Sequence, residues 1–184
     1  MEGDRSRRVK TLIERLSPSQ AGDYRALMLE AYAAHPDAFT SSVAERETLP
    51  LRWWEGRLSA EPLAKELVLG AFHAGELVGV VGLSFEQREK VRHKATLFGM
   101  YVRPHLRGQG IGRQLVQSAL EHARERPGAL VVQLTVTETN GPAVALYESC
   151  GFIRFGLEPM AVAVGSGYVS KVHMWRRVDA EEPA

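Results

Sequence analysis

One glycine-rich stretch in the second half of the 184-residue chain has the composition of an anion-binding loop. Residues 103–115, RPHLRGQGIGRQL, contain three glycines, and Arg103, Arg107 and Arg113 flank or separate them. Glycine lets backbone N–H groups approach a ligand without an intervening Cβ, and it tolerates positive φ angles. The guanidinium groups can donate charge-assisted hydrogen bonds. This stretch therefore predicts that an anion is bound close to the backbone.

The flanking sequence strengthens that prediction. Residues 93–102 have the pattern of a β-strand, and apolar residues from Ile111 onward recur at helical spacing until Pro127 and Gly128 stop the helix. A strand, a glycine loop and a helix N-terminus together form an anion site, because first-turn N–H groups lack intrahelical acceptors and the helix dipole is positive there. A Walker loop is absent, and Arg113 occupies the third glycine position of a dinucleotide fingerprint. The alternative is a turn that only lets the helix pack on its strand.

A second chemically informative block is TNGPAVALYESCGF, residues 139–152. Asn140 has the character of an N-cap, Pro142 of a first-turn residue and Gly151 of a C′ residue. The helix between them places Tyr147 on a mostly apolar face. A tyrosine on such a face buries its ring and leaves its hydroxyl group in need of a partner, so Tyr147 is a candidate functional residue. The alternative for Tyr147 is a core tyrosine that hydrogen-bonds a backbone carbonyl.

The remaining elements predict an α/β fold, a mixed β-sheet flanked by helices on both faces in a single domain. We expect strands within 9–16, 66–86 (two strands with a turn at Gly75), 93–102, 129–138, 151–164 and 168–178, and helices within 17–32, 51–60, 111–126 and 141–150. Residues 1–8 and 179–184 are polar or proline-containing, so we expect a flexible N-terminus and a flexible C-terminal tail around a domain of residues 9–178.

Composition excludes several functional classes. A formal net charge of +1 gives no general attraction to nucleic acid, and no apolar run is long enough to span a membrane. A cytoplasmic location is the expectation, because the start lacks the apolar core of a signal peptide. The single cysteine, Cys150, excludes a disulfide framework, and the histidines lack metal-ligand spacing, so no metal is expected. Cys150 precedes Gly151 on the small apolar helix face and is interpreted as a core residue.

The two blocks together resemble the GNAT N-acetyltransferase superfamily. Residues 107–112 have its R-x-x-G-x-G form, and residues 140–152 its N-x-x-A-x-x-L-Y-x-x-x-G-F form. The resemblance covers about 9–178 and implies that acetyl-CoA inserts between the fourth and fifth strands. It also implies a set of cofactor-binding residues: backbone groups of Met100, Tyr101 and Val102, the loop residues Arg107, Gly108, Gln109, Gly110, Ile111, Gly112 and Arg113, and the side chains of Asn140 and Tyr147.

The resemblance further implies an acetyl-CoA-dependent N-acetyltransferase, in which a primary amine attacks the thioester directly in a ternary complex. Tyr147 would protonate the thiolate, and a general base would deprotonate the amine. Glu86 is the first choice for the base, with His93 and Glu138 as further candidates, because all three lie at expected strand ends. A non-catalytic acyl-CoA sensor or partner-binding domain is the alternative function.

The acceptor side is less defined by the sequence. Residues 35–47 lie between the first two helices, in a region that often contacts the acceptor in this superfamily. Phe39, Ser41, Ser42 and Glu45 are therefore candidate acceptor contacts, or else a helix cap with a solvated face. The sequence does not select among small amines and proteins as acceptor, or define the acyl-chain length. A homodimer is common in similar proteins, but nothing in this chain indicates one.

Overall fold

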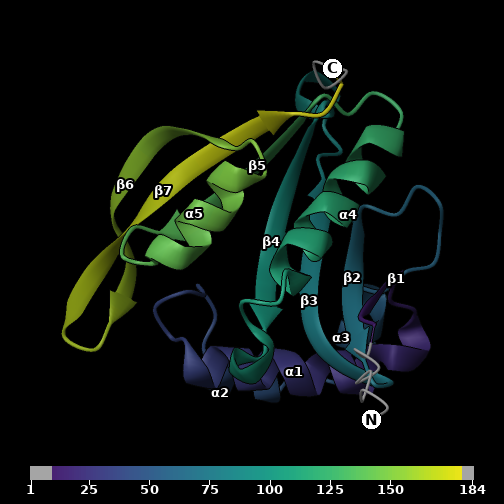
Figure 1. The fold of residues 1–184 in the computed structure, drawn as a ribbon, viewed down its shortest axis with the longest axis horizontal. Helices are drawn as coiled ribbons and strands as arrows, with labels where there is room; N and C mark the ends of the chain where they lie inside the picture. Colours follow the sequence, from purple (N-terminus) through teal and green to yellow (C-terminus); the bar gives the residue numbers. More distant parts are fainter. Residues whose placement is uncertain (1–9, 180–184) are drawn as a thin grey trace, which may run out of the picture.

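The computed structural model of the protein describes residues 10–179 and has the predicted α/β fold (Figure 1). Its elements are β1 (Leu12–Arg15), α1 (Ala21–Ala34), α2 (Val43–Glu47), α3 (Leu51–Gly56), β2 (Glu66–His73), β3 (Glu76–Phe85), β4 (Lys94–Val102), α4 (Ile111–Glu125), β5 (Val131–Thr137), α5 (Gly141–Ser149), β6 (Ile153–Val164) and β7 (Gly167–Arg177). Only the short helix α2 was not predicted as a separate element. The flexible tails expected at 1–8 and 179–184 lie outside the described residues, apart from residue 179.

The seven strands form one mixed sheet in the order β1-β2-β3-β4-β5-β7-β6. All neighbouring pairs are antiparallel except β4 and β5, which are parallel and pair only from Lys94 opposite Val131 to Thr96 opposite Gln133. Beyond Thr96 the two strands separate, so the edge of β4 that faces β5 has no ladder partner there. The sheet is therefore open between β4 and β5 beyond Thr96 and Gln133 (Figure 1).

A β-bulge lies in β4 where the separation begins. Gly99 and Met100 together stand opposite the single residue Val81 of β3, and Gly99 has a φ of +60°. A glycine tolerates this angle, and a bulge bends its strand and increases the local twist. The bulge begins three residues after the last pair with β5, at Thr96, so the bend that it introduces is consistent with β4 continuing away from β5.

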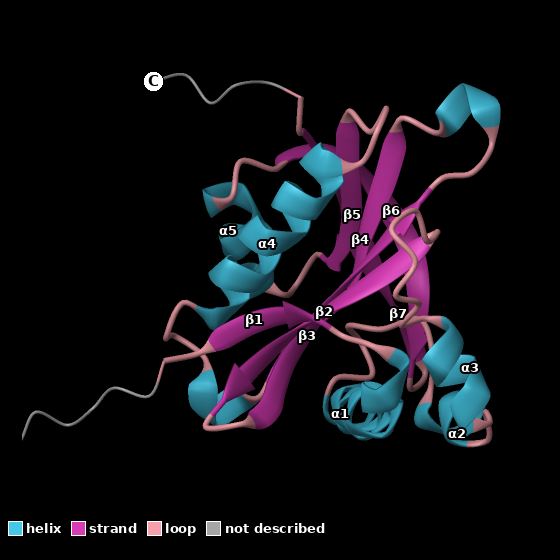
Figure 2. Ribbon diagram, turned by 90° about the vertical axis from the view of Figure 1, so that its right-hand side faces the viewer, coloured by secondary structure: helices cyan, strands magenta, loops and turns pink. Residues whose placement is uncertain are grey.

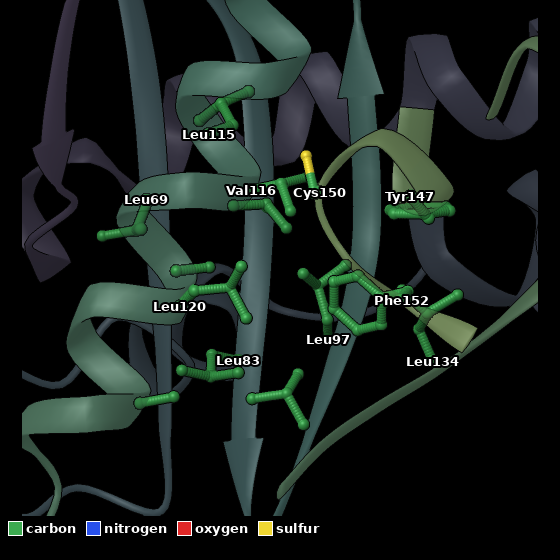
Figure 3. Close-up of a cluster of buried hydrophobic side chains, with 14 of the residues drawn as sticks. Leu69, Leu83, Leu97, Leu115, Val116, Leu120, Leu134, Tyr147, Cys150 and Phe152 are labelled. Atoms are coloured by element: carbon green, nitrogen blue, oxygen red, sulfur yellow. The ribbon is translucent and has the colours of Figure 1, made fainter. Parts of the chain in front are cut away.

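Helices cover both faces of the sheet, as predicted (Figure 2). On one face α4 and α5 pack over a core that includes Leu83, Leu97 and Leu134 (Figure 3). On the other face α1 and α3 cover β2, β3 and β4 around Trp54 and Tyr24, whose rings meet edge to face. The first core includes residues of both β4 and β5, whereas the second does not reach β5.

The loop between α1 and α2 is hydrogen-bonded to β5 and β7, which lie across the opening from β4. The Oγ1 atom of Thr137 on β5 donates a hydrogen bond to the carbonyl oxygen of Asp37 at 2.7 Å. The Nζ atom of Lys171 on β7 donates to the carbonyl oxygen of Ala38 at 3.5 Å. Thr137 and Lys171 are the two buried polar side chains found among residues 10–179, and both hold this loop.

The hairpin of β6 and β7 extends beyond the body of the molecule, with β6 at the edge of the sheet (Figure 1). Register shifts interrupt its pairing between Arg154 and Gly156 and again between Glu158 and Val162, and Pro159 lies within the second shift. The strand exposes several large apolar side chains, namely Ile153, Phe155, Leu157 and Met160.

Candidate active site

A cavity of about 620 Å³ occupies the open side of the sheet. It brings together ten of the predicted cofactor-binding residues: Met100, Tyr101, Val102, Arg107, Gly108, Gly110, Ile111, Gly112, Arg113 and Asn140. Gln109 lies in the same loop but is exposed and does not line the cavity. Residues from the end of β4, the glycine loop and the start of α5 therefore share one concave surface.

Within the glycine loop, each glycine has its own structural reason. Gly108 has a φ of +75° and Gly110, the N-cap of α4, a φ of +81°, and a Cβ at either position would meet no atom within 4 Å. Backbone conformation thus accounts for these two glycines. At Gly112 a Cβ would lie 3.1 Å from the Met100 methyl group, so close packing accounts for the third.

The N-terminus of α4 is electrostatically open to an anion. The first intrahelical bond is donated by Gln114 to Gly110, so the N–H groups of Ile111, Gly112 and Arg113 have no helical acceptor. The first turn of α4 contains no acidic residue that would neutralise the positive end of the helix dipole. This arrangement suits a phosphate group.

The two arginines of the loop, Arg107 and Arg113, also make hydrogen bonds that connect structural elements. Arg107 donates from Nε to the carbonyl oxygen of Val102 at 2.9 Å, and its NH2 group lies 3.0 Å from Nε2 of His35. Arg113 donates to the carbonyl oxygen of Ser149 at the end of α5 at 2.9 Å. Arg107 therefore joins the loop to β4 and α1, and Arg113 joins α4 to α5.

Asn140 has the predicted N-cap position of α5. Its Oδ1 atom accepts a hydrogen bond from the backbone N–H of Ala143 at 3.2 Å. Because this bond uses the carbonyl end of the side-chain amide, the NH₂ end remains available, and Asn140 lines the cavity. One residue can thus cap the helix and donate to a ligand.

Tyr147 is more enclosed than the sequence suggests. It is 6% exposed, packs edge to face on Phe152, and does not line the cavity (Figure 3). Its hydroxyl group has no hydrogen-bond partner among residues 10–179. The oxygen atom keeps slight solvent exposure, because it is not among the fully buried polar atoms without partners in that range. Burial raises the pKa of Tyr147 well above its ordinary value of 10. Burial therefore widens the pKa difference between this phenol and an ordinary thiol, and proton donation by Tyr147 remains a prediction.

Glu86 lies far from the cavity and is not retained as the candidate base. Its backbone N–H donates to Lys94, at the start of β4, whereas the cavity lies at the end of that strand. Its carboxylate pairs with Arg88 at 3.3 Å near the surface. Because β3 and β4 are antiparallel, the C-terminal end of β3 lies beside the N-terminal end of β4, which is the end remote from the cavity.

The other candidates of the sequence occupy varied positions. His93 adjoins Lys94 at the same distant end, and Glu138 is exposed next to Thr139, which lines the cavity. Cys150 is buried in the core beneath α5, as expected for a structural thiol (Figure 3). No three potential metal ligands gather anywhere in residues 10–179, and no helix there has the length and apolar content to cross a membrane.

The sequence only partly identified one wall of the cavity, which is formed by His35, Asp37, Ala38 and Phe39. Phe39 was a candidate acceptor contact and does line the cavity. Ser42 and Glu45 instead form a capping box at the start of α2, and Ser41 accepts a hydrogen bond from Arg46. No sequence signal marks His35, because its approach to Arg107 depends on the fold.

These features define an α/β protein in which a helix N-terminus suited to an anion lies beside a gap between two parallel strands. The sequence profile described as the acetyltransferase (GNAT) family matches residues 26–152, and the chain belongs to this family.

Known proteins resemble the chain in sequence and in structure. It is 29% identical over 130 residues to a mycothiol acetyltransferase of Salinispora tropica, covering 71% of this chain and 40% of that protein. It is 31% identical over 121 residues to the [ribosomal protein bS18]-alanine N-acetyltransferase of Salmonella typhimurium, covering 61% of this chain and 80% of that protein. An acetyltransferase of the GNAT family from Streptococcus pneumoniae has a TM-score of 0.80 at 26% identity, covering 91% of this chain and 99% of the other. The chain spans less than half of the length of the mycothiol acetyltransferases that it matches.

Proposed function

We propose that the chain is an N-acetyltransferase, which transfers an acetyl group from acetyl-CoA to a primary amine by direct attack in a ternary complex. The observation that carries this proposal is one continuous cavity from the free N–H groups of α4 to the gap between β4 and β5. A ligand that fills it needs an anionic end and a long arm that can pair with a strand edge. Acetyl-CoA has a pyrophosphate and an amide-containing arm, so it fits both parts.

In this proposal the residues of the chain have distinct roles. The N–H groups of residues 111–113 bind the pyrophosphate, and the backbone of Met100 to Val102 and the Asn140 amide bind the arm. Backbone N–H groups of β4 next to the gap stabilise the oxyanion that develops on the thioester. Tyr147 acts as a hydrogen-bond donor to the departing sulfur, because its raised pKa keeps the phenol protonated.

The acceptor is proposed only by class. The relatives include an enzyme that acts on an alanine of a ribosomal protein and others named for mycothiol, so both proteins and small molecules are represented. A primary amine in either kind of molecule suits direct attack on a thioester. The cytoplasmic location predicted from the sequence and the homodimer remain predictions.

A non-catalytic acyl-CoA-binding domain is the second candidate function. The observation that favours it is the position of Tyr147, which does not line the cavity, together with the distance of Glu86 from it. The two functions share the binding prediction and differ in turnover. Thiol release from acetyl-CoA in the presence of amines separates them.

The binding test uses two glycines at the ends of α4. Gly110 and Gly128 both have a φ of +81° and open space where a Cβ would lie, so Gly110→Glu and Gly128→Glu carry similar strain and the same charge. We expect calorimetry to show micromolar acetyl-CoA binding by the wild type and Gly128→Glu, and at least tenfold weaker binding by Gly110→Glu. Equal binding by both variants would refute the assignment of the loop.

The activity test measures thiol release with a panel of small amines, polyamines and a peptide with an N-terminal alanine. Release that depends on one of these amines supports the transferase. Binding of acetyl-CoA without release on any of them supports the non-catalytic candidate.

A further inference from the structure

One face of the sheet beside the opening is left partly uncovered by helices. The helices α1 and α3 pack over β2, β3 and β4, whereas Thr135 and Phe155, on β5 and β6, remain exposed. The residues of β5 and β7 that face α4 and α5 are Leu134, Val136, Val172 and Met174, which belong to that core. Side chains alternate along a strand, so Thr135, Lys171 and His173 face the other way.

The strand register places His173 beside the apex of the opening. His173 stands directly opposite Thr135 of β5. Thr135 is two residues beyond Gln133, the last residue of β5 that pairs with β4. Directly opposite residues in a sheet have Cβ atoms about 4.5–5.5 Å apart. The imidazole therefore lies one strand away from the point where β4 and β5 separate, next to the residues that line the cavity but not among them.

A carboxylate fixes the orientation of this imidazole. Nε2 of His173 and Oε2 of Glu158 lie 2.7 Å apart, and the two side chains are 34% and 51% exposed. A carboxylate only accepts, so Nε2 carries the shared proton and Nδ1 of the neutral ring keeps its lone pair. The ring of Phe155 packs edge to face on the imidazole with centroids 5.8 Å apart. This is the arrangement of a base with an orienting partner.

We propose that His173, positioned by Glu158, is the general base that deprotonates the acceptor, an inference that rests on the proposed function. Nδ1 takes one proton from the acceptor ammonium group and later releases it to solvent. The nitrogen lone pair then attacks the thioester carbon, so that a C–N bond forms and the C–S bond breaks. The sulfur leaves with the bonding electron pair and receives the second proton of the amine nitrogen, while the Tyr147 hydroxyl hydrogen-bonds it.

The charged surroundings of His173 favour binding of a cationic amine. Glu158 contributes a carboxylate from β6, and Asp37 stands in the loop that closes the cavity. A cation also lies on the same face: Lys171 stands opposite Glu158 in the strand register and donates to the carbonyl oxygen of Ala38. Lys171 is 7% exposed, and burial lowers its pKa.

The test compares His173→Ala and Glu158→Gln with His122→Ala, a histidine of α4 that bonds a backbone carbonyl of its own helix. We expect His173→Ala to lower kcat at least 100-fold, a loss typical of a general base, and to bind acetyl-CoA within twofold of the wild type. Added imidazole should restore part of the rate, and the acid limb of the kcat/KM profile should disappear. Glu158→Gln should lower kcat by a smaller factor and leave acetyl-CoA binding unchanged, because the imidazole loses the carboxylate that orients it. His122→Ala should match the wild type.

Three outcomes count against the inference, and they are distinguishable. Amine-dependent release by the wild type together with full activity in His173→Ala overturns the role of His173 and leaves the transferase intact. A loss of rate without imidazole rescue and with an unchanged pH profile assigns His173 a structural role only. Acetyl-CoA binding without release by the wild type removes the proposed transferase, and the base with it.

Discussion

Asn140 combines two functions that substitution can separate. Its Oδ1 caps α5 through the N–H of Ala143, and its NH₂ group is free at the cavity. Serine caps helices as well as asparagine does but has no amide group to reach a ligand, whereas alanine does neither. Loss of an N-cap costs about 1 kcal/mol. We therefore expect Asn140→Ala to lower the free energy of unfolding by about 1 kcal/mol and Asn140→Ser to leave it nearly unchanged.

Acetyl-CoA binding should respond differently from stability. A neutral hydrogen bond contributes about 0.5–1.5 kcal/mol, which corresponds to a roughly two- to tenfold change in Kd. Both Asn140→Ser and Asn140→Ala lose the amide donor, so both should raise Kd by that factor. Urea unfolding measures the stability term, and calorimetry with acetyl-CoA measures Kd.

The control is Ser42→Ala, which removes the N-cap of α2 at a residue that does not line the cavity. It should cost a similar amount of stability and leave Kd unchanged. Wild-type affinity in Asn140→Ser would refute the role of the amide as a ligand. A stability loss in Asn140→Ser equal to that in Asn140→Ala would show that the cap argument is wrong.

Three further predictions concern buried polar groups. Tyr147→Phe should lower thiol release about tenfold or more and change the unfolding free energy by less than about 0.5 kcal/mol, because the hydroxyl has no protein partner; kinetics and urea unfolding test this. Thr137→Val should cost about 1 kcal/mol of stability and raise the KM of the acceptor, since the bond to Asp37 is lost; Thr137→Ser should retain both. Burial raises the pKa of Tyr24 to about 12 from 10, so the folded state holds this proton more tightly than the unfolded state. Its contribution is complete below pH 10 and should be lost as pH rises toward 12, so the decline in unfolding free energy over this range should be about 3 kcal/mol smaller in Tyr24→Phe than in the wild type.

The glycine loop and the block around Asn140 were predictable because their signals are local. Positive φ at Gly110, a cap at Asn140 and the helix that follows each depend on a few neighbouring residues. The fold class followed from hydrophobic periodicity and from the order of elements. Close packing at Gly112 was not visible, because Met100 reaches it only once β4 and α4 are assembled.

The general base was not predictable from strand ends alone. Glu86 and His93 do lie at strand ends. The antiparallel pairing of β3 and β4, however, places both residues beside the N-terminal end of β4, whereas the cavity lies at its C-terminal end. His173 and Glu158 meet across a hairpin whose register shifts twice, so counting residues along the sequence would not pair them. The pKa of Tyr147 depends on its degree of burial, which a single helical face does not determine.

The irregular edge of β6 has a consequence for the behaviour of the protein at high concentration. A long edge strand with exposed apolar side chains offers a template for intermolecular β-sheet and hence for aggregation. Pro159 removes one N–H group from that edge, and the adjacent register shift distorts the strand, so a second chain cannot form an uninterrupted ladder along it. These irregularities should lower the tendency of the hairpin to form intermolecular β-sheet, although it exposes apolar residues such as Phe155 and Met160.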